Sequence, residues 1–415
     1  MSARTLATTD PELAKLIQRE TERQRSTLTL IASENYPSRA VLEAVGSILT
    51  AKYAEGYPGA RYYGGNEIID EIEELARRRA VEVFGGQHVN VQSYSGSPAN
   101  LAVYLGLLNV GDTILGMSLT HGGHLTHGHK VSASGKLFNA VHYGVGEDGL
   151  IDYDEVRRVA REAKPKLIVS GATAYPRVVD HARFQEIAQE VGALHLADVS
   201  HVAGLIAGDV YPNPTDVVDV LTTTTHKTLR GPRAAMIFCK ADYAKKIDKA
   251  VFPGLQGGPH LNAIAGVAVA LKEATSADFT TYAKRVVDNA KALASELIGT
   301  HGFNLLTGGT DSHLVLIDLR SKDITGALAE QALGKAGITV NKNTIPNETR
   351  SPFDPSGVRL GTPAVTTRGA EPKHMADLAT WIADAVASYK DNKMLAKIRR
   401  EVEAFASDLP LPGVD

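Results

Sequence analysis

One lysine in this sequence stands where a charged side chain needs a chemical reason. Lys227 follows VLTTTTH, an apolar and β-branched run that is typical of a buried strand. A lysine carried inward loses hydration, which is costly unless a partner pairs with the charge or a reaction removes it. Asp198 ends a second such run, ALHLAD, so both side chains would lie at strand ends of one sheet. Taken alone, the two residues could simply form a buried ion pair and have no role in a reaction.

A serine- and glycine-rich turn has the composition of a phosphate site. Ser95, Gly96 and Ser97 follow a short apolar run and precede Pro98, which suits the first turn of a helix. A helix N-terminus offers free N–H groups and the positive end of the helix dipole, and both favour a phosphate. The same residues would also make a plain serine cap without any ligand.

The segment HGGHLTHGH brings four histidines close together, at positions 121, 124, 127 and 129. No cysteine or carboxylate lies among them, and a metal site needs a closed set of ligands, so we expect no metal. Some of the rings could simply pack, and one could stack on a flat ligand.

These pieces together match the needs of one cofactor, pyridoxal phosphate. It requires a lysine for a Schiff base, an acid facing the ring nitrogen, and a phosphate cup. Lys227, Asp198 and the turn at 95–97 would supply them, and Asp198 would keep the ring nitrogen protonated. The sequence contains neither G-x-x-x-x-G-K-[ST] nor a G-x-G-x-x-G that opens a helix after a strand, which argues against a nucleotide site.

Composition narrows the class of protein further. The 415 residues are 43% hydrophobic and 22% charged with a net charge of −3, so a nucleic-acid partner is not expected. The single cysteine, Cys239, excludes an internal disulfide and fits a reducing compartment. No signal peptide is recognisable and no apolar run is long enough to span a bilayer, so we expect a cytoplasmic protein without a membrane partner.

The pattern of apolar runs predicts the elements that position these residues. Asp10 and Pro11 are typical of a helix start, and that helix should run to about Arg25. From about 89 to 238, short apolar runs alternate with helical stretches, which predicts a mostly parallel sheet covered on both faces. Shorter strands after Gly302 predict a second α/β unit. We therefore expect an N-terminal arm at 1–30, a large domain at 31–278 and a small C-terminal domain at 279–415.

The chain resembles the serine hydroxymethyltransferase family over nearly its whole length. The motifs that carry the resemblance are LIASENYPS, KYAEGYPGARYYGG, SGSPAN, HGGHLTHG, DVSHVAGL, TTTTHKTLRGPR, FPGLQGGP, TVNKN and VRLGTPA. The resemblance implies a fold type I pyridoxal-phosphate enzyme with an aspartate aminotransferase-like large domain. It also implies a homodimer that converts L-serine and tetrahydrofolate to glycine and 5,10-methylenetetrahydrofolate, and back.

The family's cofactor residues transfer to matching positions here. The resemblance makes Lys227 the Schiff-base lysine, Asp198 the partner of the ring nitrogen and His124 the stacking ring. His201 and Thr173 would lie near the phenolic oxygen, although Thr173 stands where the family often has serine. The phosphate would be held by Ser95, Gly96, Ser97 and His226, together with Tyr53 and Gly258 from the neighbouring subunit.

Substrate residues transfer in the same way. Arg359 would bind the substrate carboxylate, with Ser33 beside it. Glu55 matches the family's acid–base glutamate and Tyr63 its companion, and both would reach across the dimer interface. The positions that match folate contacts are Leu119, Leu125, Tyr62 and Asn343.

Three alternatives are weighed against this function. An α-methylserine hydroxymethyltransferase would share almost every motif, and its substrate would place the extra methyl group in the pocket near Thr173 and Ser200. A folate-independent aldolase acting on β-hydroxy amino acids is opposed by the matches at Tyr62, Tyr63, Leu119 and Asn343. An inactive relative that only binds partners is disfavoured because Lys227, Asp198, Glu55 and Arg359 are all present.

Overall fold

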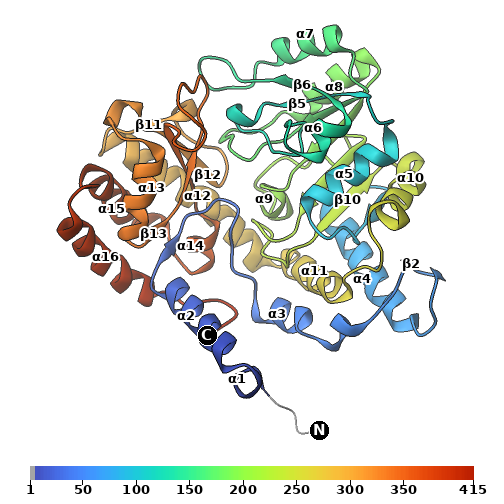
Figure 1. The fold of residues 1–415 in the computed structure, drawn as a ribbon, viewed down its shortest axis with the longest axis horizontal. Coiled ribbons are helices and arrows are strands. Elements are labelled where there is room, and N and C mark those ends of the chain that lie inside the picture. Colours follow the sequence, from blue (N-terminus) through green and yellow to red (C-terminus); the bar gives the residue numbers. More distant parts are fainter. Residues whose placement is uncertain (1–4) are drawn as a thin grey trace.

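A seven-stranded sheet forms the centre of the larger part of the molecule, as Figure 1 shows for this computed structural model, which describes residues 5–415. In spatial order its strands are β4 (His88–Asn90), β10 (Ala235–Cys239), β9 (Val220–Thr224), β8 (Leu194–Asp198), β7 (Leu167–Ser170), β5 (Thr113–Met117) and β6 (Asn139–Tyr143). Only β10 runs antiparallel to its neighbours, and the remaining pairs are parallel. The expected mostly parallel sheet is confirmed.

Helices cover both faces of this sheet, which is why strands β7, β9 and β10 are buried along their whole length. They are α3 (Arg39–Val45), α4 (Glu67–Phe84), α5 (Gly96–Leu107), α6 (Ala133–Leu137), α7 (Tyr153–Ala163), α8 (His181–Val191), α9 (Ala203–Ala207), α10 (Ala244–Lys249) and α11 (Leu261–Ala274). One apolar core joins α4, α9 and α11 to the sheet, and two others join α5 with α10 and α7 with α8.

A second, four-stranded antiparallel sheet builds the smaller part. Its strands, in order, are β11 (Asn304–Leu305), β12 (Leu314–Asp318), β15 (Gly357–Gly361) and β14 (Asn341–Asn343). The accompanying helices are α13 (Gly326–Lys335), α14 (Pro363–Thr367), α15 (Met375–Ala387) and α16 (Asn392–Ser407). Helix α12 (Ala277–Gly299) links the two parts, because its first half packs in the large core and its second half in the small one.

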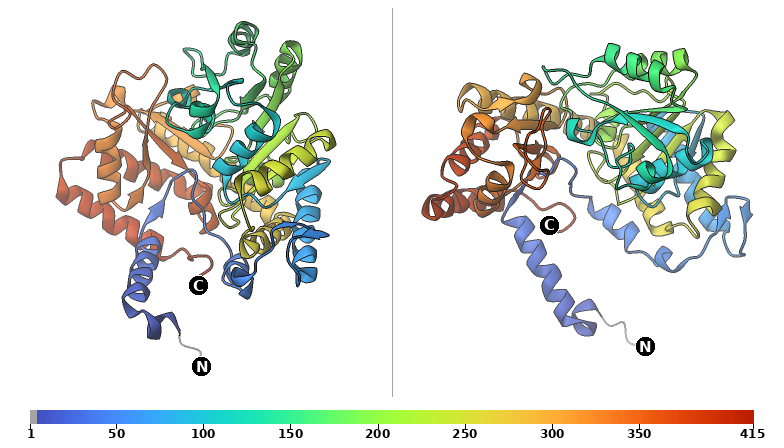
Figure 2. Two further views of the ribbon diagram at one scale, coloured as in Figure 1. Left: turned by 45° about the vertical axis from the view of Figure 1, so that its right-hand side comes forward. Right: turned by 45° about the horizontal axis from the view of Figure 1, so that its top comes forward.

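The N-terminal segment begins with α1 (Leu6–Thr9) and α2 (Pro11–Arg25), which project from the body in Figure 2. The helix expected from Asp10 is confirmed, and the Asp10 carboxylate accepts a hydrogen bond from the Leu13 N–H at 2.9 Å. Strand β1 (Leu28–Thr29) then pairs in parallel with β13 (Ile338–Thr339) of the smaller part. The fully buried Arg368 fastens this segment by donating to the backbone carbonyls of Gln24, Arg25, Thr27, Ala406, Leu409 and Pro410.

The remaining elements are short. They are the hairpin β2 (Gly56–Tyr57) and β3 (Ala60–Arg61), and the helical turns η1 (Ile48–Ala51), η2 (Leu119–His121), η3 (Ala241–Tyr243), η4 (Ala250–Leu255), η5 (Leu306–Gly308), η6 (Arg320–Lys322) and η7 (Pro372–His374). Across residues 5–415, no helix combines the length and the apolar character that crossing a membrane requires.

Candidate active site

One cleft gathers most of the residues that the sequence singled out. It lies beyond the carboxyl ends of β8 and β9, where ligands collect in open α/β sheets, and Arg359 on β15 closes it from the smaller part. Its predicted members are Ser33, Ser95, Gly96, Ser97, His124, Thr173, Asp198, His201, His226, Lys227 and Arg359. It is also lined by Ser200 and His127, which the sequence had indicated only as a pocket residue and as one of four clustered histidines, and by Glu34, Ala172, Thr224 and Arg233, which no sequence pattern had indicated.

Lys227 is buried in this cleft, three residues beyond the end of β9. Burial lowers the pKa of its amine to about 8; Asp198 opposes this effect, and the positive charges of Arg359 and Arg233 add to it. Within residues 5–415, Lys227 and Asp198 do not form an ion pair, so the simple ion-pair interpretation of these two residues is wrong. The amine is therefore held in a form that loses its proton unusually easily.

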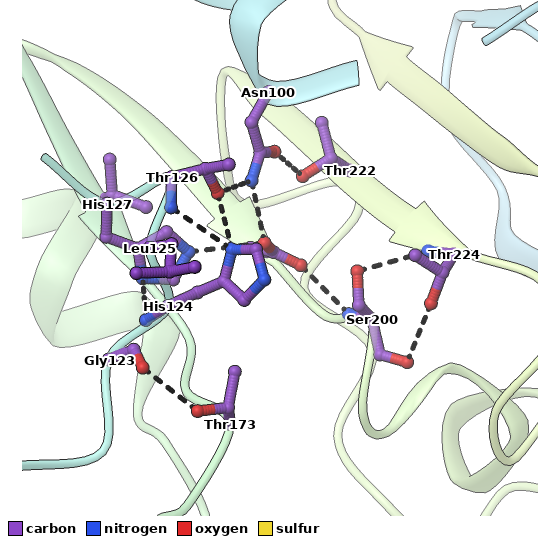
Figure 3. Close-up of polar contacts among 12 residues, drawn as sticks. Asn100, Gly123, His124, Leu125, Thr126, His127, Thr173, Ser200, Thr222 and Thr224 are labelled. Atoms are coloured by element: carbon purple, nitrogen blue, oxygen red, sulfur yellow. Dashed lines mark hydrogen bonds and ion pairs between the residues drawn. The ribbon is translucent and has the colours of Figure 1, made fainter. Parts of the chain in front are cut away.

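Asp198 is held by three groups of its own protein, from Asn100, His127 and Ser200, and these three residues are labelled in Figure 3. Its carboxylate accepts from Asn100 Nδ2 at 2.8 Å and from the Ser200 N–H at 3.1 Å, and it lies 3.2 Å from His127 Nε2. Burial alone would raise the pKa of Asp198, but the hydrogen bond with His127 and the nearby His124 ring hold the pKa well below its usual value. Asp198 therefore remains a carboxylate that can face a cationic group.

The serine-rich turn fits a phosphate better than a plain cap. Ser95 precedes α5, yet in the described part of the chain its hydroxyl makes no capping hydrogen bond. A Cβ atom on Gly96 would lie 2.7 Å from the Thr224 methyl carbon, so only glycine leaves this approach open. His226 contributes a buried Nδ1 atom that has no hydrogen-bond partner among residues 5–415. A bound phosphate would satisfy these groups together.

The His124 ring is neutral and fixed in orientation. Burial lowers its pKa to about 4, and its Nδ1 atom accepts from the Thr126 N–H at 3.2 Å while lying 2.7 Å from Thr126 Oγ1. Thr173 also lines the cleft, and its hydroxyl donates to the Gly123 carbonyl at 2.9 Å (Figure 3). A phenolic oxygen in the cleft would therefore compete with this carbonyl for the Thr173 proton.

Arg359 is positioned from two sides. Its Nε donates to Asn341 Oδ1 at 3.1 Å and its Nη1 to the Thr173 carbonyl at 2.6 Å. These bonds use two of the five guanidinium donors, which leaves donors for an anion in the cleft. Burial lowers the pKa of Arg359 to about 10, so the side chain remains cationic near neutral pH.

Five predicted residues form a separate group outside this cleft, which we call the loop cluster: Tyr53, Glu55, Tyr62, Tyr63 and Gly258. The Tyr63 hydroxyl donates to Glu55 at 3.1 Å, and the Tyr53 and Tyr63 rings meet edge to face at 5.5 Å. Tyr53 also packs beside Gly258. None of the five lines the cleft of the same chain.

A buried ion network holds the loop cluster in place. Arg61 pairs with Glu73 at 2.7 Å and Asp70 at 2.9 Å, and it donates to the carbonyls of Ala54 and Gly56, which flank Glu55. The side chains of Arg61 and Glu73 are 4% and 1% exposed, so this pair is screened from water. The loop that carries Glu55 is therefore preorganised.

The other three predicted folate contacts also lie outside the cleft lining. Leu119 begins η2, Leu125 follows His124 and is 43% exposed, and Asn343 ends the edge strand β14. The structure thus brings together the predicted cofactor and carboxylate residues that belong to one chain.

Comparisons with known proteins identify the family of this chain. The family model described as "Serine hydroxymethyltransferase" matches residues 6–382. A serine hydroxymethyltransferase of Desulfotalea psychrophila is 58% identical over 406 residues, covering 98% of this chain and 95% of that protein. The corresponding protein of Xanthomonas campestris pv. campestris is 57% identical, with 98% of each chain covered. That of Acidobacterium capsulatum is 53% identical, covering 98% of this chain and 96% of the relative. The chain therefore belongs to the serine hydroxymethyltransferase family.

Proposed function

We propose that this protein converts L-serine and tetrahydrofolate to glycine and 5,10-methylenetetrahydrofolate, reversibly and with pyridoxal 5′-phosphate as its cofactor. The observation that carries this proposal is the convergence of Lys227, Asp198 and Arg359 in one cleft. The family is one of fold type I pyridoxal-phosphate enzymes, and the mostly parallel sheet fits that class. The names of the relatives support this reaction and lend no support to the α-methylserine or aldolase alternatives.

The residues present fit the cofactor. When bound, pyridoxal phosphate supplies an electron-withdrawing ring that stabilises negative charge developing at the substrate Cα. Lys227 would attach it, because an amine with a pKa of about 8 is partly neutral at physiological pH. Asp198 would hold a proton on the ring nitrogen. The Ser95 hydroxyl, the open approach at Gly96 and the Nδ1 atom of His226 would receive the phosphate.

Arg359 would orient the amino acid. Its remaining N–H groups match the two oxygens of a carboxylate, with Ser33 available beside it. The bond to Asn341 comes from the neighbouring strand β14, which pairs Asn341 with Arg359. The substrate carboxylate would therefore be held by the smaller part and the cofactor by the larger part.

The loop cluster would complete the site of a second copy of the chain. Glu55 offers a carboxylate and Tyr63 a hydroxyl, and such groups can transfer protons at the serine hydroxyl or the folate. Both residues lie outside the cleft of their own chain. Large apolar side chains in the same stretch of the chain are exposed: Ile48 is 84% exposed, Tyr62 71% and Ile68 66%. Exposed apolar side chains grouped in this way are typical of a subunit interface. These two features support a homodimer with shared sites.

Co-expression of two inactive variants tests the shared site. Lys227→Ala removes the cofactor lysine from one cleft, and Glu55→Gln removes the carboxylate that the other chain would supply. If sites are shared, a mixed dimer contains one intact site, and random pairing restores about one quarter of the wild-type activity. Each variant expressed alone is the control. Activity that stays at the level of the single variants would contradict the shared site.

The proposed domain division is an arm at 1–30, a large domain at 31–278 and a small domain at 279–415. All strands of the large sheet lie between positions 88 and 239, and those of the small sheet between 304 and 361. Helix α12 begins at Ala277, so the proposed boundary lies in its first turn. A cytoplasmic location stays a prediction.

Reconstitution tests the proposed cofactor and reaction together. Pyridoxal phosphate is titrated into cofactor-free protein, and serine cleavage is then measured with and without tetrahydrofolate. We expect saturable binding with a new absorbance band at the edge of the visible range, and cleavage that requires tetrahydrofolate. Lys227→Ala should lose the band, whereas the exposed Lys245→Ala should keep it. A wild-type protein that binds no pyridoxal phosphate would refute the proposal.

A further inference from the structure

A buried histidine pair joins the two sheets directly behind the cleft. Nδ1 of His201 lies 3.2 Å from Nε2 of His313, and the two rings stack with their centroids 5.4 Å apart and their planes 23° apart. Both side chains are buried, at 5% and 0% exposure. His201 follows β8 of the large sheet, whereas His313 immediately precedes β12 of the small sheet. The sequence analysis assigned no role to His313.

Both rings are neutral. Burial lowers the pKa of His201 well below its usual value, and Lys227 and Arg359 act in the same direction. Burial likewise lowers the pKa of His313 to about 3, helped by Arg359 and Lys227 and opposed by the backbone of Ala32. A hydrogen bond between two neutral imidazoles needs one N–H and one bare nitrogen, so the tautomer of one ring sets that of the other.

The position of His313 is itself fixed by the strand that carries it. Its carbonyl accepts a hydrogen bond from the Thr362 N–H at 3.0 Å, just beyond β15. Strand β12 pairs with β15 so that Leu316 lies opposite Arg359. The imidazole that contacts His201 therefore lies directly before β12, the strand that pairs with the strand of the arginine proposed to bind the substrate.

We propose that His313 is a positioning residue that holds the His201 ring in one orientation and couples the tautomer of that ring to its own. His201 lines the cleft with Lys227, and Nδ1 of its ring is occupied by His313. The remaining nitrogen, Nε2, then has the opposite protonation state to Nδ1, so the hydrogen bond with His313 couples the tautomer of His201 to that of His313. The inference rests on the proposed cofactor site and adds to it a residue of the small sheet.

A double-mutant cycle on cofactor affinity tests this role. Glutamine at position 313 can place an amide nitrogen or oxygen near the position of Nε2, whereas asparagine is too short to reach His201. We expect His313→Asn to raise the dissociation constant of pyridoxal phosphate about tenfold, which equals about 1.4 kcal/mol, and His313→Gln to raise it less than about threefold. In a His201→Asn background, His313→Asn should cause no further change, because its partner is already absent.

Controls separate positioning from a purely structural role. The thermal midpoint of each cofactor-free variant is measured alongside affinity, since a structural role would lower it for Asn and Gln alike. Additive effects of the two substitutions, or equal affinity losses for Asn and Gln, would overturn the inference. If the wild-type protein binds no pyridoxal phosphate, the proposed function fails; if it binds and the cycle is additive, only the role of His313 fails.

Discussion

Replacing the cleft lysine should stabilise the cofactor-free protein. A pKa of about 8 for Lys227, in place of the usual 10.5, means that the folded state disfavours the charged amine. This difference corresponds to about 3 kcal/mol, because each tenfold change in proton affinity is worth about 1.4 kcal/mol. Lys227→Met removes the charge and keeps an unbranched side chain of similar length, while Asp198 retains His127 and Asn100 as partners. The variant should therefore unfold with a free energy up to about 3 kcal/mol higher at pH 7.

The pH dependence gives this prediction its sign. Below pH 8 the lysine is charged in both the folded and the unfolded state, so the penalty is fully present in the wild type. Between pH 8 and 10.5 the unfolded state binds more protons than the folded state, so wild-type stability rises relative to the variant. Above about pH 10.5 the lysine is neutral in both states, and the pH-dependent part of the advantage is gone.

Urea unfolding of the cofactor-free proteins at pH 7, 8, 9 and 10 is the assay, at one fixed protein concentration. The exposed Lys245→Met is the matched control, and its difference from wild type should not change across this range. The reasoning is refuted if Lys227→Met is no more stable than wild type at pH 7. It is equally refuted if the difference does not shrink as the pH rises.

Three further substitutions test the remaining geometry. Arg359→Lys keeps the charge but loses the planar fork, so KM for serine should rise about tenfold or more in steady-state assays, with a smaller effect on kcat. Gly96→Ala should weaken pyridoxal phosphate binding about tenfold in an equilibrium titration, because the new Cβ atom would lie 2.7 Å from the methyl carbon of Thr224. The control Gly334→Ala places its Cβ atom in open space and should leave the affinity unchanged. Arg61→Met leaves the buried Glu73 without its cation and should lower the free energy of unfolding by about 3–5 kcal/mol. Unchanged KM, equal affinity for the two alanine variants, or an unchanged urea midpoint would contradict the respective prediction.

Local sequence patterns were sufficient to predict the strand ends and the helix starts. The runs before Asp198 and Lys227 are rich in apolar and β-branched residues because β8 and β9 lie inside a sheet that is covered on both faces, and such runs are readable without a structure. Asp10 and Pro11 likewise mark the start of α2 by local capping chemistry alone. Those signals depend on residues next to each other in the chain.

Contacts between distant segments could not be predicted in this way. Asn100 and His127 hold Asp198 from α5 and from the loop after η2, and neither spacing nor composition indicates that pairing. The pairing of His201 with His313 joins residues from two different sheets. The separation of Glu55 from its own cleft is also invisible in the sequence, because it depends on how the hairpin β2–β3 packs.

The fate of the serine side-chain carbon tests the central claim most directly. Serine labelled with carbon-13 at its hydroxymethyl carbon is incubated with the pyridoxal phosphate-loaded protein, with and without tetrahydrofolate, and the products are followed by NMR. The proposed function predicts one glycine and one labelled methylene group on the folate for each serine consumed, with no comparable turnover when tetrahydrofolate is omitted. Glycine formation at the same rate without folate, or no serine consumption by the loaded protein, would contradict it.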